Sequence, residues 1–209
     1  MKDLSLRFPL WLCDVWGVVH DGHRPIPSAV AALEKHRAQG GKVIFITNAP
    51  RPMATIQAHL DAMGVARAAY DDMVTSGDVT RALMKEHRAQ GLYHLGPEID
   101  LPLFDGLGIA RVSLDEASAV VCTGFFDEMN ETAVDYRPRL RDMKRLGLTM
   151  ICANPDKVVR KGAHLVPCAG AIAEEYELMG GKVLMAGKPF APIYDLALSR
   201  AGTADRTQV

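Results

Sequence analysis

The sequence lacks a long hydrophobic run, and it lacks an excess of either charge. No stretch approaches the roughly 18 apolar residues that cross a bilayer, so a membrane is not an expected partner. The 24 Lys and Arg residues nearly balance the 25 Asp and Glu residues, and the formal net charge is -1. Such a chain has no long-range field to attract nucleic acid. We therefore expect neither a nucleic-acid-binding nor a membrane protein.

Cysteine is scarce, and the spacing of its four positions excludes several kinds of site. Cys13, Cys122, Cys152 and Cys168 lie far apart, with no CxxC pair and no metal-ligand spacing. Three of them fall in the apolar runs LWLCD, VVCTG and MICAN. Buried, reduced cysteines are typical of such runs and of a reducing compartment. The pattern predicts a cytoplasmic protein.

Short apolar runs alternate with amphipathic segments, a pattern typical of α/β proteins. Buried strands are predicted at 10–14, 42–47 and 73–76. Helices are predicted at 27–39, with Ser28 as its N-cap, at 52–63 and at 78–90. From Leu92 the strand candidates are separated by longer loops, and regularity returns with a helix at 170–179 and a strand at 182–186.

This change in the sequence pattern predicts a core domain formed by two separate segments of the chain. We expect a Rossmann-like parallel-sheet core formed by residues 1–90 and 168–209. An inserted α/β cap domain is expected at 91–167. A length of 209 residues suits a core with one smaller insert.

Three side chains that could take part in catalysis or binding lie at the ends of predicted strands. Asp14 ends the first strand, where open α/β sheets form their ligand crevice. Thr47, followed by Asn48, ends the second strand, and Lys188 follows a late strand. A carboxylate, a hydroxyl and an ammonium at one sheet edge suit the binding and transfer of a phosphoryl group.

Each of these residues also has a purely structural interpretation. Asp14 could cap the turn at Gly17, Thr47 could be a helix N-cap, and Lys188 could be a solvated loop residue. The run Asn154-Pro155-Asp156 is a good turn sequence. From the residues alone both interpretations stay open.

In this order, DVWGVVHDG, FITNAP, ICANPD and AGKP resemble the motifs of the haloacid dehalogenase superfamily. They are most similar to its class IIA branch of NagD-type and 4-nitrophenylphosphatase-like proteins. The resemblance spans residues 10 to about 201 and implies a core with a cap between the second and third motifs.

The resemblance implies a role for each matching residue. Asp14 would be the nucleophile that forms an aspartyl-phosphate and would also bind Mg²⁺. Thr47 and the backbone of Asn48 would bind the phosphoryl group, and Lys188 would hold it beside Asp14. Asn154 and Asp156 would contact substrate from a cap loop. The implied substrate is a small phosphorylated metabolite.

The chain departs from the superfamily pattern at Trp16, where its phosphatases carry an Asp that acts as the acid and base. An indole cannot exchange a proton near neutral pH. Poor leaving groups are expected to suffer most, because general acid–base catalysis contributes roughly 10² to 10⁴ in rate. The backbone carbonyl of Trp16 would still bind the metal. His20 or Asp21 could supply the proton, although a solvent-facing flap is the simpler expectation.

The second departure is at the C-terminal end. The acidic fourth motif is expected after the helix that follows Lys188, but the chain ends at Val209, and Asp205 is expected to be a turn residue. We interpret the chain as a truncated piece, with a core incomplete at this end.

Two functions from different classes follow. One is a Mg²⁺-dependent phosphohydrolase that acts on a small phosphate ester through Asp14. The other is a phospho-ligand-binding protein without catalysis, or an inactive fragment. A receiver domain is disfavoured, because its lysine would not lie so far from Thr47. An exposed sheet edge and 10 methionines would suit a homodimer, but methionine is also an ordinary core residue.

Overall fold

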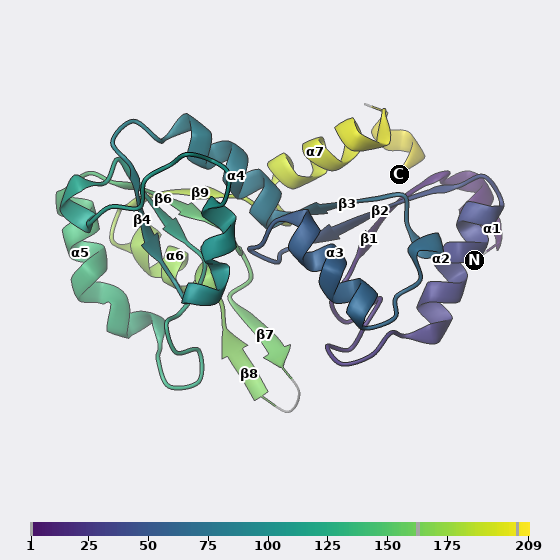
Figure 1. The fold of residues 1–209 in the computed structure, drawn as a ribbon, viewed down its shortest axis with the longest axis horizontal. Coiled ribbons are helices and arrows are strands. Elements are labelled where there is room, and N and C mark those ends of the chain that lie inside the picture. The colour runs from purple at the N-terminus through teal and green to yellow at the C-terminus, as the bar shows by residue number, and fades with distance from the viewer. Residues whose placement is uncertain (1, 162–163, 204) are drawn as a thin grey trace.

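The chain forms two α/β parts that lie side by side (Figure 1). The computed structural model describes residues 2–161, 164–203 and 205–209. Both ends of the chain lie in the first part, at the right of Figure 1. The first part contains a parallel sheet in the order β1-β2-β3. Its elements are α1 (Lys2–Arg7), β1 (Leu10–Asp14), α2 (Pro27–Ala38), β2 (Lys42–Thr47), α3 (Met53–Ala62) and β3 (Asp72–Thr75).

The second part contains a parallel sheet in the order β4-β5-β6-β9, and a separate hairpin of β7 and β8. Helix α4 (Ser76–Glu86) leads into this part, and α7 (Ala191–Ala201) returns from it to the first sheet. The elements between these helices are β4 (Leu92–Leu95), β5 (Ala119–Cys122), α5 (Arg137–Arg145), β6 (Thr149–Cys152), β7 (Val158–Lys161), β8 (His164–Pro167), α6 (Ala169–Leu178) and β9 (Lys182–Met185).

The central strands are hydrophobic throughout because helices cover both faces of each sheet. In β2, Val43 and Phe45 pack with α2 and α3, whereas Ile44 and Ile46 pack with α4 and α7. Alternate side chains point to opposite faces, so a strand covered on both sides reads as one apolar run. The same holds for β5, in which every residue is buried.

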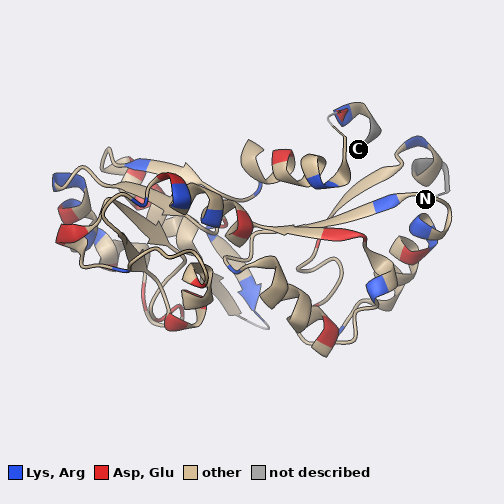
Figure 2. Cartoon of the chain, turned by 45° about the horizontal axis from the view of Figure 1, so that its top comes forward, with Lys and Arg blue, Asp and Glu red and all other residues tan. Residues whose placement is uncertain are grey.

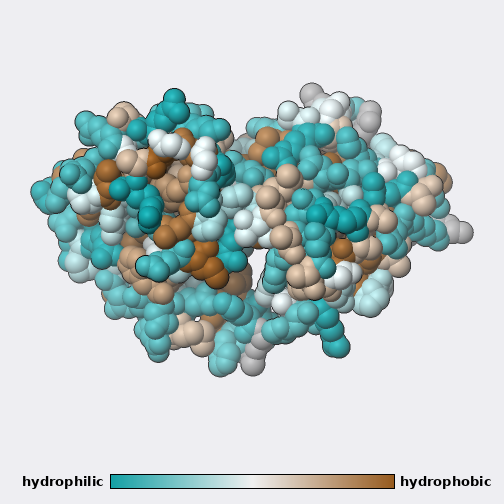
Figure 3. Space-filling view, in the orientation of Figure 1, coloured by the Kyte–Doolittle hydropathy of each residue, from teal (hydrophilic) through white to brown (hydrophobic). Residues whose placement is uncertain are grey.

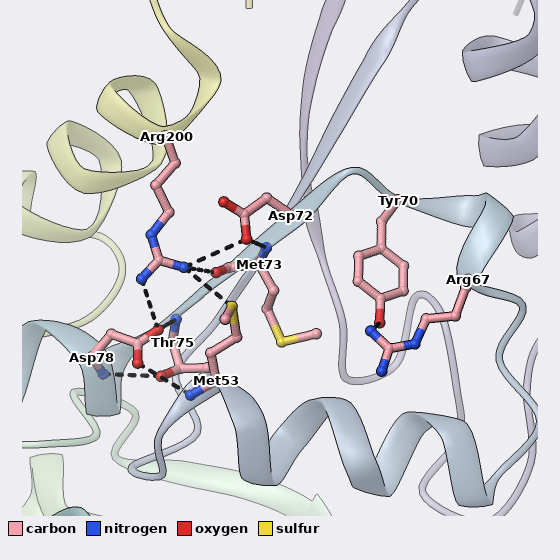
Figure 4. A network of polar contacts seen from close by, with 8 residues as sticks. All are labelled: Met53, Arg67, Tyr70, Asp72, Met73, Thr75, Asp78 and Arg200. Carbon is pink, nitrogen blue, oxygen red and sulfur yellow. Dashed lines mark hydrogen bonds and ion pairs between the residues drawn. The ribbon is translucent and has the colours of Figure 1, made fainter. Parts of the chain in front are cut away.

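Helix α7 is fastened to the first sheet by Arg200 (Figure 4). Its guanidinium lies 3.6 Å from a carboxylate oxygen of Asp72 and 3.6 Å from one of Asp78, and it donates to the backbone carbonyl of Met73. Asp78 also completes the capping box at the start of α4 with Thr75. One cationic side chain therefore connects α7, β3 and α4.

Strand β9 corrects the predicted division of the chain. It was expected in the core segment 168–209, but it pairs in parallel with β6 of the second sheet. Helix α6 packs on that sheet too, through Ile172, Ala173 and Tyr176. The second part therefore extends past residue 167, and the chain returns to the first part with the loop at Lys188 and with α7. An apolar run of strand length does not specify which sheet it joins.

Two local predictions differ from the structure, and one element was not predicted. Helix α2 begins at Pro27 with Ile26 as its N-cap, so Ser28 lies inside the first turn and is not the cap. Proline suits the first helical position, where its missing N–H costs no hydrogen bond. Helix α4 ends at Glu86, before the predicted 90. The hairpin of β7 and β8 was not predicted.

The surface carries both charges intermixed. In Figure 2, Lys and Arg alternate with Asp and Glu on both parts of the molecule. In the described part of the chain, no helix has the length and apolar character needed to span a bilayer. All four cysteines are free, and Cys122, Cys152 and Cys168 are buried, whereas Cys13 is partly exposed. Asp205 accepts a hydrogen bond from the Thr207 N–H in a short turn, as predicted.

Candidate active site

A cleft of about 850 Å³ lies at the carboxyl ends of β1, β2 and β6, between the two parts. The crevice outside the strand ends is where open α/β sheets bind ligands. The seven residues to which the family resemblance gives a role all line this cleft: Asp14, Trp16, Thr47, Asn48, Asn154, Asp156 and Lys188. The fold therefore brings together side chains that are separated by most of the chain.

Asp14 and Lys188 form an ion pair in the cleft. The Lys188 Nζ lies 2.5 Å from Oδ1 of Asp14, and the same oxygen accepts a hydrogen bond from the Val15 N–H at 2.7 Å. The Asp14 side chain is 45% exposed and that of Lys188 is 18% exposed. A carboxylate open to the cleft thus has a shielded cation beside it. Asp14 therefore does not cap the turn at Gly17, and Lys188 is not a solvated loop residue.

Asn48 fixes the position of the lysine loop. Its side-chain oxygen accepts from the Lys188 N–H at 2.7 Å, and its Nδ2 donates to the Lys188 carbonyl at 3.1 Å and to Asp156 Oδ1 at 3.0 Å. Because these bonds occupy the amide, the backbone of Asn48 is the part that can face a ligand.

Gly187 makes this approach of the lysine loop to Asn48 achievable. A Cβ at position 187 would lie 2.4 Å from Oδ1 of Asn48 and 2.8 Å from Cδ of Pro155. Both distances are shorter than real carbon contacts, so a side chain there would push the lysine loop away. The glycine of the AGKP motif is thus required by close packing.

Thr47 ends β2 with its hydroxyl near the backbone of the following loop. Its Oγ1 accepts from the Ala49 N–H at 3.3 Å, and the residue is 6% exposed. Helix α3 begins only at Met53, with Pro52 as its N-cap. Thr47 is therefore not the N-cap of α3.

The Asn154–Asp156 loop forms a turn, and both residues line the cleft. The Asn154 side-chain oxygen accepts from the Asp156 N–H at 3.0 Å, which is the geometry of an Asx turn. Asp156, in this loop, accepts a hydrogen bond from the Asn48 side chain and lines the cleft.

Cys13 precedes Asp14 and is excluded as a competing nucleophile. Burial raises the pKa of its thiol to about 11, the charge of Asp14 adds to this rise, and Lys188 opposes it. A thiol with this pKa stays protonated near neutral pH, and the reactive form of cysteine is the thiolate.

Trp16 and His20 form the wall beyond Asp14. Trp16 is 41% exposed, and its ring meets the ring of His20 edge-on at 5.3 Å. His20 is buried and lines the cleft, and its Nδ1 accepts from the Gly22 N–H at 3.0 Å. Burial lowers the pKa of His20, and the nearby His59 lowers it further. Among the two proposed proton donors, His20 lines the cleft, whereas Asp21 is held by its own loop through His23 and Arg24.

An ion pair between Arg51 and Asp100 joins the two walls of the cleft, and the sequence analysis missed it. The Arg51 Nε donates to Asp100 Oδ1 at 2.9 Å, from the loop after β2 to a 3-10 helix after β4. Burial raises the pKa of Asp100, and Arg51 opposes that rise. Arg51 follows Thr47 closely and could have been noticed. Nothing near Asp100 in the sequence indicated its partner.

The comparisons with known proteins agree with this geometry. Residues 11–110 match the family model of haloacid dehalogenase-like hydrolases. A solved hydrolase of the haloacid dehalogenase-like family from Brucella suis 1330 is 45% identical, with a TM-score of 0.92. The alignment covers 99% of this chain and 81% of that one. This chain belongs to the haloacid dehalogenase-like hydrolase family. The family predicted from the sequence motifs is therefore confirmed, as is the Rossmann-like α/β fold.

More distant solved structures share the fold. A p-nitrophenyl phosphatase from Archaeoglobus fulgidus is 23% identical with a TM-score of 0.74, over 94% of this chain and 75% of that one. The glycerol phosphate phosphatase from Mycobacterium tuberculosis, solved in complex with magnesium, is 24% identical with a TM-score of 0.69, over 95% and 60% of the two chains. Comparison with the curated proteins gives no match.

The cleft offers a magnesium ion few protein ligands, so it suits an ion that the substrate phosphate also holds. In residues 2–161, 164–203 and 205–209, no group of three or more His, Cys, Asp and Glu side chains could hold a metal. Mg²⁺ commonly binds through one or two carboxylates together with waters and substrate phosphate oxygens. Asp14, open to the cleft, suits a magnesium ion that binds with the phosphate group.

Proposed function

We propose that the protein is a Mg²⁺-dependent phosphohydrolase that acts on a small phosphate ester through an aspartyl-phosphate at Asp14. The observation that carries the proposal is the contact of Asp14 with Lys188 in a cleft of a haloacid dehalogenase-like hydrolase. A cation beside the attacking carboxylate lies where negative charge accumulates during phosphoryl transfer.

The residues of the cleft divide the chemistry among them. A carboxylate oxygen of Asp14 attacks phosphorus, the new O–P bond forms, and the bond from phosphorus to the leaving oxygen breaks. Lys188 balances the charge of the carboxylate and the phosphoryl oxygens. The hydroxyl of Thr47 and the backbone N–H of Asn48 bind those oxygens. Water then attacks phosphorus, which releases phosphate and restores Asp14.

Asp14, together with the backbone carbonyl of Trp16, would hold the magnesium ion, which supplies charge stabilisation to the phosphoryl oxygens when bound. Asn154 and Asp156 would contact substrate from the second part, which we propose acts as the cap. Ion pairing of Arg51 with Asp100 and the bond from Asn48 to Asp156 hold the two parts together around the cleft.

Hydrolysis of 4-nitrophenyl phosphate with and without Mg²⁺ tests the proposal. The leaving group of this ester needs little acid catalysis, so the lack of an acid at Trp16 should not prevent turnover. We expect Mg²⁺-dependent turnover that is lost in Asp14→Asn and kept in Asp195→Asn, a matched change on the exposed face of α7 outside the cleft. Turnover that survives Asp14→Asn would contradict the mechanism.

A folded wild-type protein without turnover would favour the other function, a phospho-ligand-binding protein. In that case Asp14→Asn is expected to leave phosphate affinity close to that of the wild type.

A further inference from the structure

Among the described residues, none of the three side chains at positions 16, 20 and 21 is a good proton donor to a group that leaves from the phosphate at Asp14. Trp16 carries an indole, which donates a hydrogen bond but does not give up its proton near neutral pH. His20 accepts from the Gly22 N–H with Nδ1, so this nitrogen cannot also carry the proton of an imidazolium. Asp21 is turned into its own loop. Unless His59 in the same cleft supplies the proton, an ester cleaved here releases its oxygen with little help from an acid.

The indole of Trp16 is held in this position by close packing. A Cβ at Gly22 would come within 2.6 Å of the Trp16 ring, and the ring of His20 meets it edge-on. The ring thus occupies a defined place in the wall of the cleft, next to Asp14. It remains 41% exposed, so its surface is available to a ligand.

The opposite wall of the cleft is also apolar and exposed. Phe126 is 48% exposed and Ile99 is 63% exposed, and both line the cleft from the second part of the molecule. The ring of Phe126 stacks on the ring of Tyr136 at 5.9 Å, and the guanidinium of Arg139 lies 5.2 Å from its centroid. In Figure 3, hydrophobic residues reach the surface of this part beside the opening between the two parts.

Resting on the proposed function, we propose that Trp16 and Phe126 make this site specific for aryl phosphates. The aromatic leaving group lies between the wall of Trp16 and the wall of Phe126 and Ile99. When Asp14 attacks phosphorus, the electron pair of the breaking P–O bond stays on the phenolate oxygen. This oxygen is stable enough to depart without a proton from the enzyme, and solvent protonates it afterwards. Trp16 thus stands where the family has an acid, and it also offers the leaving group an aromatic surface.

The leaving group is tested first, with two esters that carry the same ring. Phenyl phosphate releases a phenolate, whereas benzyl phosphate releases an alkoxide, a much poorer leaving group. We expect kcat/KM to be about 10²-fold or more higher for phenyl phosphate, the size of the missing acid catalysis. Glycerol phosphate, which lacks the ring and has an alkyl oxygen, is expected to be the poorest of the three.

The apolar wall is tested by substitution. Phe126→Ala is expected to raise KM for phenyl phosphate about 5-fold or more, as for the loss of an aromatic contact of about 1 kcal/mol. Phe126→Leu should recover part of this loss. Leu178→Ala, a matched change of an exposed residue outside the cleft, should leave KM unchanged. Trp16→Asp should narrow the difference between the two ring esters, because it restores a carboxylic acid.

Different results separate this inference from the proposed function. Benzyl phosphate or glycerol phosphate turned over as efficiently as phenyl phosphate would overturn the inference alone. So would an unchanged KM for phenyl phosphate in Phe126→Ala. A larger preference for phenyl phosphate in His59→Gln than in the wild type would also overturn it, since His59 lines the cleft and would then be the acid that assists the benzyl ester. No phosphate release from any ester, 4-nitrophenyl phosphate included, would overturn the proposed function itself.

Discussion

The ammonium of Lys188 lies 2.5 Å from the carboxylate of Asp14, although the two residues come from the loop after β9 and the end of β1. The strands that precede them belong to different sheets. The contact therefore depends on how the chain passes from the second part back to the first. It places a shielded cation beside the one residue proposed to attack phosphorus.

Removing this cation is expected to slow turnover while the fold persists. Lys188→Met should lower kcat for 4-nitrophenyl phosphate about 10²- to 10³-fold, the usual loss when a group that stabilises transition-state charge is removed. Lys182→Met, on the exposed start of β9, is the matched control and should retain kcat. Steady-state kinetics measure both, and a Lys188→Met enzyme with wild-type kcat would contradict the assigned role.

Asn48 is expected to support both stability and activity, because its amide makes three hydrogen bonds to the Lys188 loop and Asp156. Asn48→Ala should lower the free energy of unfolding by about 1–3 kcal/mol, since buried partners lose their bonds. It should also lower kcat, because Lys188 is less well fixed. Urea denaturation and steady-state kinetics measure the two effects.

The control for this substitution is Asn130→Ala, whose amide bonds only within an exposed loop to Asp127 among the described contacts. It is expected to change neither quantity appreciably. Equal effects of the two substitutions would mean that the Asn48 network has no special part in the site.

Much of the candidate site could be predicted from the sequence because it lies at strand ends. Asp14 and Thr47 each follow a short apolar run, and parallel strands of one sheet end at a common edge. Local pattern is sufficient for such residues. The confirmed family resemblance added Asn154 and Asp156, which line the same cleft as Lys188.

Long-range pairing could not be predicted in the same way. The run at 182–185 is apolar in either sheet, so its pairing with β6 depends on packing between distant segments. The pairing of Arg51 with Asp100 likewise depends on the approach of the two parts. Ser28 illustrates a local error, in which Pro27 already provided the better start of the helix.

Arg200 is expected to matter for stability and not for chemistry. Arg200→Met removes the donor to the Met73 carbonyl and the cation beside Asp72 and Asp78 (Figure 4). The free energy of unfolding should fall by about 1–3 kcal/mol, and KM should stay unchanged because Arg200 does not line the cleft. Arg206→Met breaks an exposed pair with Asp195 and should cost less than about 1 kcal/mol. A reversed order of the two losses would contradict this account.

His94 is expected to make the protein less stable in acid. Burial lowers its pKa to about 4, and Arg111 adds to this effect, whereas histidine in an unfolded chain titrates near 6.5. Between these values the unfolded chain binds a proton that the folded chain does not. Stability therefore falls as the pH decreases from 6.5 to 4, by at most about 3 kcal/mol, and less because water reaches part of the ring.

The variant His94→Gln tests this contribution, because glutamine can still bond with the Thr123 hydroxyl and does not titrate. Its urea midpoint should depend less steeply on pH between 4 and 6.5 than that of the wild type. His23→Gln, at an exposed position, should keep the wild-type slope. Equal slopes for all three proteins would exclude His94 as the cause.

Trapping the covalent intermediate tests the central claim most directly. Borohydride reduces an acyl phosphate, so protein reduced during turnover of 4-nitrophenyl phosphate should carry homoserine in place of the aspartate at position 14. Peptide mass spectrometry should find it there, dependent on substrate and absent from Lys188→Met at equal times. Turnover without reduction at position 14, or reduction at another carboxylate, would show that phosphoryl transfer does not pass through Asp14.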